Sequence, residues 1–90
     1  MTKEQIVAQI SSSTGVDKKV ALPVVEAFME VVQGALAKKE NVYLRGFGSF
    51  VIKHREEKIA RNISKNTTIV IPAHDIPAFK PAKAFVDLIK

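Results

Sequence analysis

Hydrophobic residues recur with two different periods along this 90-residue chain. In the first half they return every three or four positions, a spacing typical of amphipathic helices. One helix is expected to end at about Thr14, with a capping box at Thr2–Gln5 before it and Gly15 after it. A second, longer helix is expected after Asp17, and its apolar stripe is wide enough to contact both its own chain and a partner.

The second half alternates between apolar and polar positions, which predicts strands. A strand opens at Val42, and Gly46-Phe47-Gly48 then interrupts the pattern, which indicates a tight turn or a close backbone approach. The prolines within and beside Ile76–Phe79 indicate an edge strand. A last helix is expected to begin at Lys80–Pro81, and its buried face would hold Phe85, Leu88 and Ile89.

The stretch from Lys53 to Ile71 has few large apolar side chains and does not fit a core. Its end, Thr67–Ile71, is β-branched throughout and should be extended. Asparagines in Asn62–Asn66 tolerate the backbone conformations that a chain reversal needs. We therefore predict a β-ribbon arm over about residues 53–71, with Ile63 at its tip.

Positive charge is concentrated in this arm. The net charge is +5, and residues 1–44 contribute none of it, because five anions balance their five cations, whereas residues 45–90 hold nine cations and four anions. Alternate residues of a strand share a face, so Lys53, Arg55 and Arg61 are expected on one face, with Lys58 opposite unless a bulge intervenes. Segregated positive charge favours a polyanionic partner, nucleic acid first.

The composition favours a dimer. With 47% hydrophobic residues, the chain has more apolar surface than a small body can bury once the arm projects, and homodimerisation is the simplest solution. The chain has no cysteine, which excludes disulfides and thiolate metal sites and is consistent with a reducing cytoplasm. We expect neither a signal peptide nor an apolar run that approaches transmembrane length, and hence no membrane partner.

No group of residues indicates catalysis. The histidines, His54 and His74, lie twenty positions apart without a metal-ligand pattern, and they are expected in the exposed arm and in a loop, respectively. The adjacent Glu56 and Glu57 would point to opposite faces of a strand, so they cannot act as a carboxylate pair. We therefore expect no enzyme, no metal, no cofactor and no small-molecule substrate.

Four motifs together resemble one family over the full length of the chain. They are Gly46-Phe47-Gly48-Ser49-Phe50, Arg61-Asn62, Ile71-Pro72-Ala73 and Pro77-Ala78-Phe79-Lys80-Pro81. With them the chain resembles the HU/IHF family of bacterial histone-like DNA-bending proteins, and HU more than integration host factor. The resemblance implies an α+β fold: an intertwined homodimer with a helical body, an antiparallel three-stranded sheet per chain and a protruding β-ribbon arm. It implies one domain over residues 1–90, with a helical dimerisation half (1–41), a sheet (42–80, arm at about 53–71) and a C-terminal helix (81–90).

The resemblance also implies a function and its residues. Two arms would embrace the minor groove of duplex DNA, bend it and compact it in the bacterial nucleoid, largely without sequence specificity and with a preference for nicked or bent DNA. The DNA contacts it implies are Lys3, Gly46, Gly48, Lys53, Arg55, Lys58, Arg61, Asn62, Lys80 and Lys83, with Ile63 as a wedge between base pairs. The dimer core it implies is Phe28, Val32, Leu36, Leu44, Phe47, Phe50 and Phe79. The family usually has proline where this chain has Ile63, so the size of the kink stays open.

Other readings of the same residues remain open. A sequence-specific bending factor of the integration-host-factor type depends on DNA shape as well as on contacts, which one chain does not reveal. The chain also leaves open a heterodimer with a paralogue. An assembly module whose arm adds strands to a partner's sheet is disfavoured by the arm's positive charge. A platform for single-stranded nucleic acid is disfavoured because residues 53–71 contain no aromatic ring.

Overall fold

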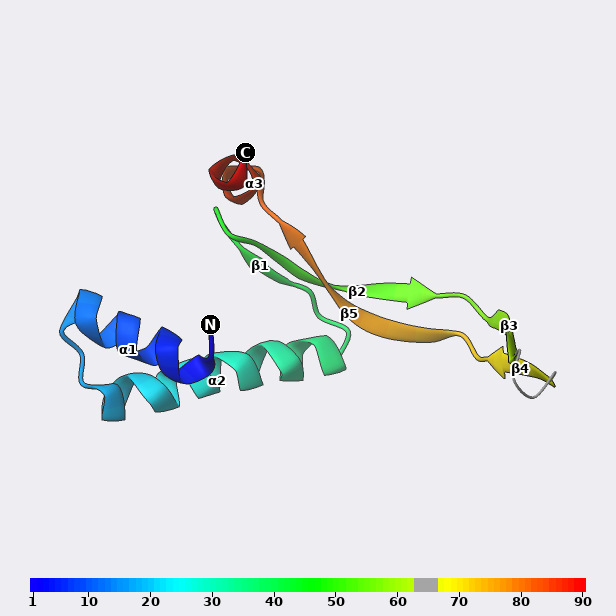
Figure 1. Cartoon of the computed structure of the whole chain (residues 1–90), viewed down its shortest axis with the longest axis horizontal. Coiled ribbons are helices and arrows are strands. Elements are labelled where there is room, and N and C mark those ends of the chain that lie inside the picture. The colour runs from blue at the N-terminus through cyan, green and yellow to red at the C-terminus, as the bar shows by residue number, and fades with distance from the viewer. Residues whose placement is uncertain (63–66) are drawn as a thin grey trace. The chain divides into compact units, whose positions relative to one another are not determined.

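The computed structural model describes residues 1–62 and 67–90. It divides into two compact units, residues 1–35 and residues 36–90, each of which is described by itself. The predicted tip of the arm, including Ile63, lies outside the described residues. The predicted α+β class is confirmed, because helices and antiparallel strands both occur along the chain (Figure 1).

The first unit begins with helix α1 (Lys3–Thr14). Its capping box forms as predicted: Thr2 Oγ1 accepts the Gln5 N–H at 3.3 Å, and Gln5 Oε1 accepts the Thr2 N–H at 2.8 Å. Gly15 ends the helix with a left-handed φ of 76°, a conformation that glycine adopts without steric cost. Local interactions at the residues that flank α1, Thr2 and Gly15, therefore determine where the helix begins and ends.

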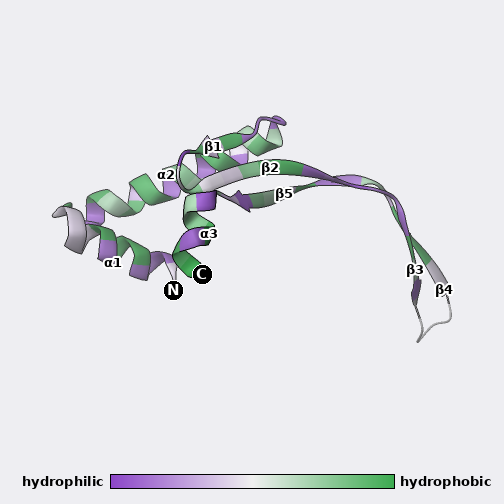
Figure 2. Cartoon of the chain, turned by 90° about the horizontal axis from the view of Figure 1, so that it is seen from above, coloured by the Kyte–Doolittle hydropathy of each residue, from purple (hydrophilic) through white to green (hydrophobic). Residues whose placement is uncertain are grey.

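Helix α2 (Lys18–Ala37) begins beside Asp17, whose carboxylate accepts the Lys19 N–H at 2.9 Å. Within the described residues it buries only Ala21 and Val32, although hydrophobic residues recur along its whole length (Figure 2). Its exposed apolar side chains are Val20, Val24, Phe28, Met29 and Val31. The predicted apolar stripe is therefore present, and most of it is left uncovered by this chain.

By length and composition, α2 could cross a membrane. The expectation that no apolar run approaches transmembrane length is therefore wrong for this helix. The core helix of a soluble protein meets the same two criteria, so this single helix is weak evidence for a membrane span. Its exposed apolar stripe instead matches the width expected of a helix that packs on two sides.

The second unit contains a three-stranded antiparallel sheet in the order β1-β2-β5. The strands β1 (Val42–Leu44) and β5 (His74–Pro81) pair with opposite edges of β2 (Gly48–Arg55). The prediction that β5 is an edge strand is confirmed. It also extends further than predicted in both directions, so that His74 lies in a strand and not in a loop.

The last helix, α3 (Lys83–Ile89), begins later than predicted, with Ala82 as its N-cap. Pro81 ends β5 instead of opening the helix, because a proline at a sheet edge loses no ladder hydrogen bond. The predicted buried face is also wrong for the single chain. Leu88 and Ile89 are 85% and 76% exposed, and only Phe85 is partly buried.

Four phenylalanines join the sheet to α3. The ring of Phe79 lies 5.0 Å from that of Phe50 and 5.2 Å from that of Phe47, measured between centroids, and Phe47 lies 5.4 Å from Phe85. Gly48 allows this packing, since a Cβ at this position would stand 2.5 Å from Phe79 Cζ. The predicted close backbone approach is therefore confirmed at Gly48.

The arm consists of β3 (Lys58–Asn62) paired antiparallel with β4 (Thr67–Ile71). It continues the β2–β5 ribbon away from α3 (Figures 1 and 2). Two short unpaired steps, Glu56–Glu57 and Pro72–Ala73, separate β3 and β4 from the sheet. Pro72 has no N–H to give to a ladder, which accounts for a break at this point. From Val51 on, β2 pairs with β5 alone, so Lys53 already lies in a two-stranded ribbon, and the unpaired step divides this ribbon into two paired parts.

Candidate nucleic-acid interface

The pairing of the two long strands determines which side chains share a face. Arg55 pairs with His74, and Lys58, three residues later, pairs with Ile71, three residues earlier. The register therefore continues through the break with no extra residue in either strand, and no bulge intervenes. By this alternation Arg61 lies on the same face as Arg55, as predicted, and Lys58 lies on the opposite face.

The two faces of the ribbon differ in net charge. We call the face defined by Lys53, Arg55, Arg61 and Lys80 the cationic face, because each of these residues occupies the same side in the register. Glu57 also lies on this side, in the unpaired step between β2 and β3. The opposite face carries Asp75 and Glu56 together with His54 and Lys58. A polyanion is therefore attracted to one side of the ribbon.

A hollow of about 270 Å³ lies on the sheet near the start of the cationic face. Val51 and Ala78, which pair directly across β2 and β5, contribute to its apolar lining. Lys53 and Lys80 also line it, and Ile52 completes it. An apolar floor between two ammonium groups suits a sugar–phosphate backbone, which presents anionic oxygens beside deoxyribose C–H groups.

Two cations predicted to contact DNA lie outside this ribbon. Lys3, in the helical unit, has its ammonium 3.8 Å from the carboxylate of Glu26, and both side chains are about half exposed. Lys83 opens α3, which has only seven residues. Neither residue belongs to the same strand face as Lys53 and Arg55, so their DNA contacts stay predictions.

The glycines of the turn between β1 and β2 have clear structural roles. Gly46 has a φ of 81°, and the Phe47 N–H closes the turn by donating to Leu44 O at 3.0 Å. The Phe47 carbonyl in turn accepts the Ala82 N–H at 3.0 Å. Because these bonds occupy both backbone groups of Phe47, the predicted phosphate contacts of the loop would need the flanking amides of Gly46 and Gly48.

An ionic cluster at the base of the arm was not predicted. His54 and Asp75 pair across β2 and β5, and His54 Nδ1 lies 2.8 Å from Asp75 Oδ1. Lys39 Nζ donates to Asp75 Oδ2 at 2.8 Å, and Glu56 Oε1 lies 3.3 Å from His54 Nε2. Lys39 and Asp75 are 36 positions apart, so no local sequence pattern indicates that they meet.

This cluster shifts two acid–base equilibria. The hydrogen bond to Asp75 is the main cause that raises the pKa of His54 above its ordinary value, with a further contribution from Glu56. The pKa of Asp75 is lowered, first by its hydrogen bond from Lys39 and then by that from His54. All of these groups are solvent-accessible, so the cluster fixes the geometry of the arm's base more than it stabilises the fold.

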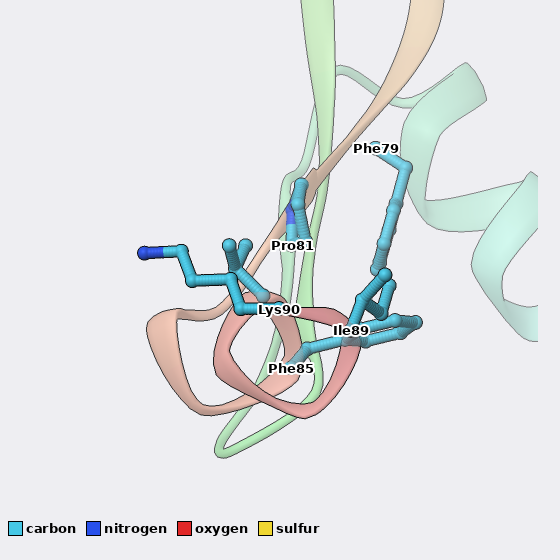
Figure 3. A pocket seen from close by; sticks show the side chains of 6 residues that line it. Phe79, Pro81, Phe85, Ile89 and Lys90 are labelled. Atoms are coloured by element: carbon cyan, nitrogen blue, oxygen red, sulfur yellow. The ribbon is translucent and has the colours of Figure 1, made fainter.

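One of the predicted dimer-core residues, Phe79, lines an open apolar hollow beside α3. Phe79, Pro81, Phe85, Val86, Ile89 and Lys90 line a hollow of about 350 Å³. In Figure 3, Phe79, Phe85 and Ile89 lie next to one another along this hollow, with Pro81 and Lys90 on its other side. An exposed apolar hollow of this kind is typical of an interaction surface.

The described residues contain no group of three or more histidine, cysteine, aspartate or glutamate residues that could hold a metal ion. Of the predicted DNA contacts, the register brings Lys53, Arg55, Arg61 and Lys80 together and places Lys58 opposite. Asn62 is the last residue of β3, and its predicted DNA contact stays a prediction. The proposed wedge, Ile63, lies outside the described part of the chain, so that role stays a prediction.

Comparisons with known proteins agree on one family. A family model described as bacterial DNA-binding protein matches residues 1–90. The DNA-binding protein HU of Lactococcus lactis is 41% identical over 88 residues, which cover 98% of this chain and 97% of that protein. The SPbeta prophage-derived DNA-binding protein HU 2 of Bacillus subtilis is 39% identical over 90 residues, which cover 100% of this chain and 98% of that protein.

Solved structures give the same result. An HU–DNA cocrystal structure from Anabaena matches with a TM-score of 0.94 and 34% identity, covering 99% of this chain and 97% of that chain. HU from Thermotoga maritima matches with a TM-score of 0.71 and 27% identity over the full length of both chains. The fold is therefore similar to that of HU proteins across the helical and the sheet-containing units.

Proposed function

The chain belongs to the bacterial DNA-binding protein family, and from this premise we propose that it is a histone-like architectural protein that binds, bends and compacts duplex DNA. It binds largely without sequence specificity, because its contacts go mainly to the phosphate backbone. HU and IHF, which this chain resembles, are themselves standard examples of minor-groove binders that bend DNA. The proposed site of action is the bacterial nucleoid.

The observation that carries this proposal is the separation of charge along the ribbon. Lys53, Arg55, Arg61 and Lys80 share one side with Glu57, whereas Asp75 and Glu56 share the other with His54 and Lys58. The first side therefore carries most of the net positive charge of the ribbon and is the side that attracts a polyanion more strongly. This difference directs the cationic face toward the sugar–phosphate backbone.

The proposed complex contains two chains. Exposed apolar residues of α2 and the hollow beside α3 would be covered by a second copy, which would also supply a second arm. Two arms on one duplex would embrace the minor groove from two positions. Bent, nicked or gapped DNA would then be preferred, because it costs less free energy to deform than an intact straight duplex.

Salt dependence tests the proposal. Four cations on each of two chains would displace about eight counterions, so log K should fall with log salt concentration with a slope of about −7. Gel-shift titrations of one intact duplex at several salt concentrations measure this slope. A slope near zero would contradict the proposal, and competition with random-sequence duplex measures the expected lack of sequence preference.

A pair of variants tests the assignment of the faces. Arg55→Ala removes one contact from each of two chains and should reduce the magnitude of the slope by about 2, whereas Lys58→Ala on the opposite face should change it less. The two residues are close in sequence and both exposed, so Lys58→Ala is a matched control. Equal effects of the two substitutions would show that the register does not determine which cations contact DNA.

A further inference from the structure

An exposed apolar pair lies in the middle of the arm. Ile59 of β3 and Val70 of β4 are directly opposite in the register, and their relative exposures are 69% and 55%. Direct cross-strand neighbours have Cβ atoms about 5 Å apart, so the two side chains form one apolar patch. Within the described residues, nothing in the chain covers this patch.

The register places the patch on the cationic face. Ile59 alternates with Arg61, and Val70 is two positions from Thr68, the partner of Arg61. In the other direction along the strand, Arg55 occupies the same side beyond the unpaired Glu57. On this face the patch therefore lies between Arg61 and Glu57, with Arg55 on the far side of Glu57.

The surrounding charge determines what can cover this patch. A protein surface that covered Ile59 and Val70 would also have to accommodate Arg55 and Arg61 on either side, and so would need an apolar centre between acidic groups. Duplex DNA offers this arrangement along its whole length, because each groove wall places deoxyribose C–H groups between phosphates. A groove wall thus complements both the charge and the apolar centre of this face.

We propose that Ile59 and Val70 pack against the deoxyribose walls of the minor groove and form the salt-independent part of the arm's contact with DNA. This inference rests on the proposed function and specifies how the arm is held between its cationic contacts. The contact is independent of base sequence, since every nucleotide has the same sugar. It also differs in position and mechanism from a wedge at the arm tip.

Threonine substitutions test the contact while preserving the strands. The variant Ile59→Thr/Val70→Thr keeps two β-branched side chains, which retain strand propensity, and adds hydroxyl groups to the patch. Removing this apolar contact should weaken binding to an intact duplex by about tenfold, with an unchanged slope of log K against log salt concentration. The heat-capacity change of binding, measured by titration calorimetry, should become less negative.

The opposite face of the same strands offers a matched control. Ile69 and Ile71 belong to β4, are exposed, and lie on the side that does not carry Arg61. The variant Ile69→Thr/Ile71→Thr should weaken binding less than twofold. Equal weakening by both double variants would show that the apolar residues act through the stability of the arm, and would overturn the proposal.

The remaining outcomes are also decisive. Hydroxyl-radical cleavage of minor-groove deoxyriboses should be suppressed by the unsubstituted protein and less so by Ile59→Thr/Val70→Thr. Unchanged affinity and protection in this variant would overturn the proposal, as would a loss of self-association without a loss of DNA binding. If the unsubstituted protein itself failed to bind duplex DNA, the proposed function would fail instead, and the two failures are thus distinguishable.

Discussion

At the scale of single residues, Gly48 is the glycine with the least room for a side chain. A Cβ there would stand 2.5 Å from Phe79 Cζ and 2.6 Å from the carbonyl oxygen of Lys80. The ring could rotate, but the carbonyl belongs to the strand that pairs with Gly48 and is fixed by that pairing. Any side chain at this position must therefore separate β2 from β5 or displace the aromatic cluster.

This crowding predicts that Gly48→Ala destabilises the protein by about 1–3 kcal/mol, the usual cost of overpacking. Gly34→Ala is the control, because Gly34 is exposed in α2 and a Cβ there meets nothing within 4 Å. The control should raise stability by about 0.5–1 kcal/mol through its higher helix propensity. Urea unfolding of both variants at one protein concentration measures these effects, and a neutral Gly48→Ala would contradict the packing described.

Contacts between residues close in the sequence could be predicted from it, whereas contacts between distant residues could not. Gly46-Phe47-Gly48 indicated a tight turn or a close backbone approach, and the structure has the turn at Gly46 and the close approach at Gly48. The bond between Lys39 and Asp75 could not be predicted, because it joins residues 36 positions apart and depends on how the sheet is paired. Local patterns thus predicted the caps and the turn, whereas contacts across the sheet required the register.

At the scale of elements, the ionic cluster links β2, β5 and the turn after α2 at the base of the arm. His54 faces Asp75 across the strands and Glu56 along its own strand, and Lys39 reaches Asp75 from the turn. The raised pKa of His54 means that the imidazolium form is favoured in the folded state. Its contribution to stability is therefore complete below its unfolded pKa and is lost as the pH rises through its folded pKa.

The lowered pKa of Asp75 gives a contribution to stability with the opposite pH dependence. Its contribution is present above the unfolded value near 3.8 and is lost as the pH falls through the folded pKa. Taken together, the two shifts predict that the cluster is fully formed between about pH 4 and pH 6.5 and weakens above this window as His54 loses its proton.

Titration of the His54 ring by NMR checks this prediction. In the variant Asp75→Asn, the pKa of His54 should fall toward its ordinary value, because its main hydrogen-bonding partner is no longer charged. The variant Glu56→Gln should lower it less, since Glu56 is the smaller of the two causes. A His54 pKa that Asp75→Asn leaves unchanged would show that the cluster does not form in solution.

The strands of the arm illustrate the same division between local and long-range information. Alternation correctly predicted that Arg61 shares a face with Lys53 and Arg55. Lys53 and Arg55 pair with β5 alone and so belong to a two-stranded ribbon, whereas no local pattern indicated the unpaired step at Glu56–Glu57. Charge indicates the function of a strand residue, whereas backbone pairing determines which element it belongs to.

At the scale of the whole molecule, the apolar residues exceed what one chain covers. Among the described residues, the buried apolar side chains are only Val7, Ala21 and Val32. Phe28, Phe47 and Phe79, which were predicted to belong to a dimer core, are each more than a third exposed in the single chain. The sequence indicated this excess through its composition, and the structure locates it on α2 and beside α3.

A proposed dimer explains this excess and leads to a concentration-dependent stability. If a second copy covers these surfaces, a hundredfold increase in protein concentration adds about 2.7 kcal/mol to the free energy of unfolding by mass action. For a dimer of this size, the melting temperature should then rise by about 5–10 °C. Calorimetry at two concentrations measures the shift, and sedimentation at the same concentrations reports the mass.

A charge placed on the exposed stripe of α2 should abolish this behaviour. Phe28→Glu would bury an unpaired carboxylate in the proposed contact, so the dimer should dissociate, and the separated chains should unfold because their own cores are too small. Gln33→Glu adds the same charge at an exposed polar position of the same helix and should leave the dimer intact. A stable monomer that melts at one temperature over the whole concentration range would contradict the proposed dimer, and with it the pairing of two arms on one duplex.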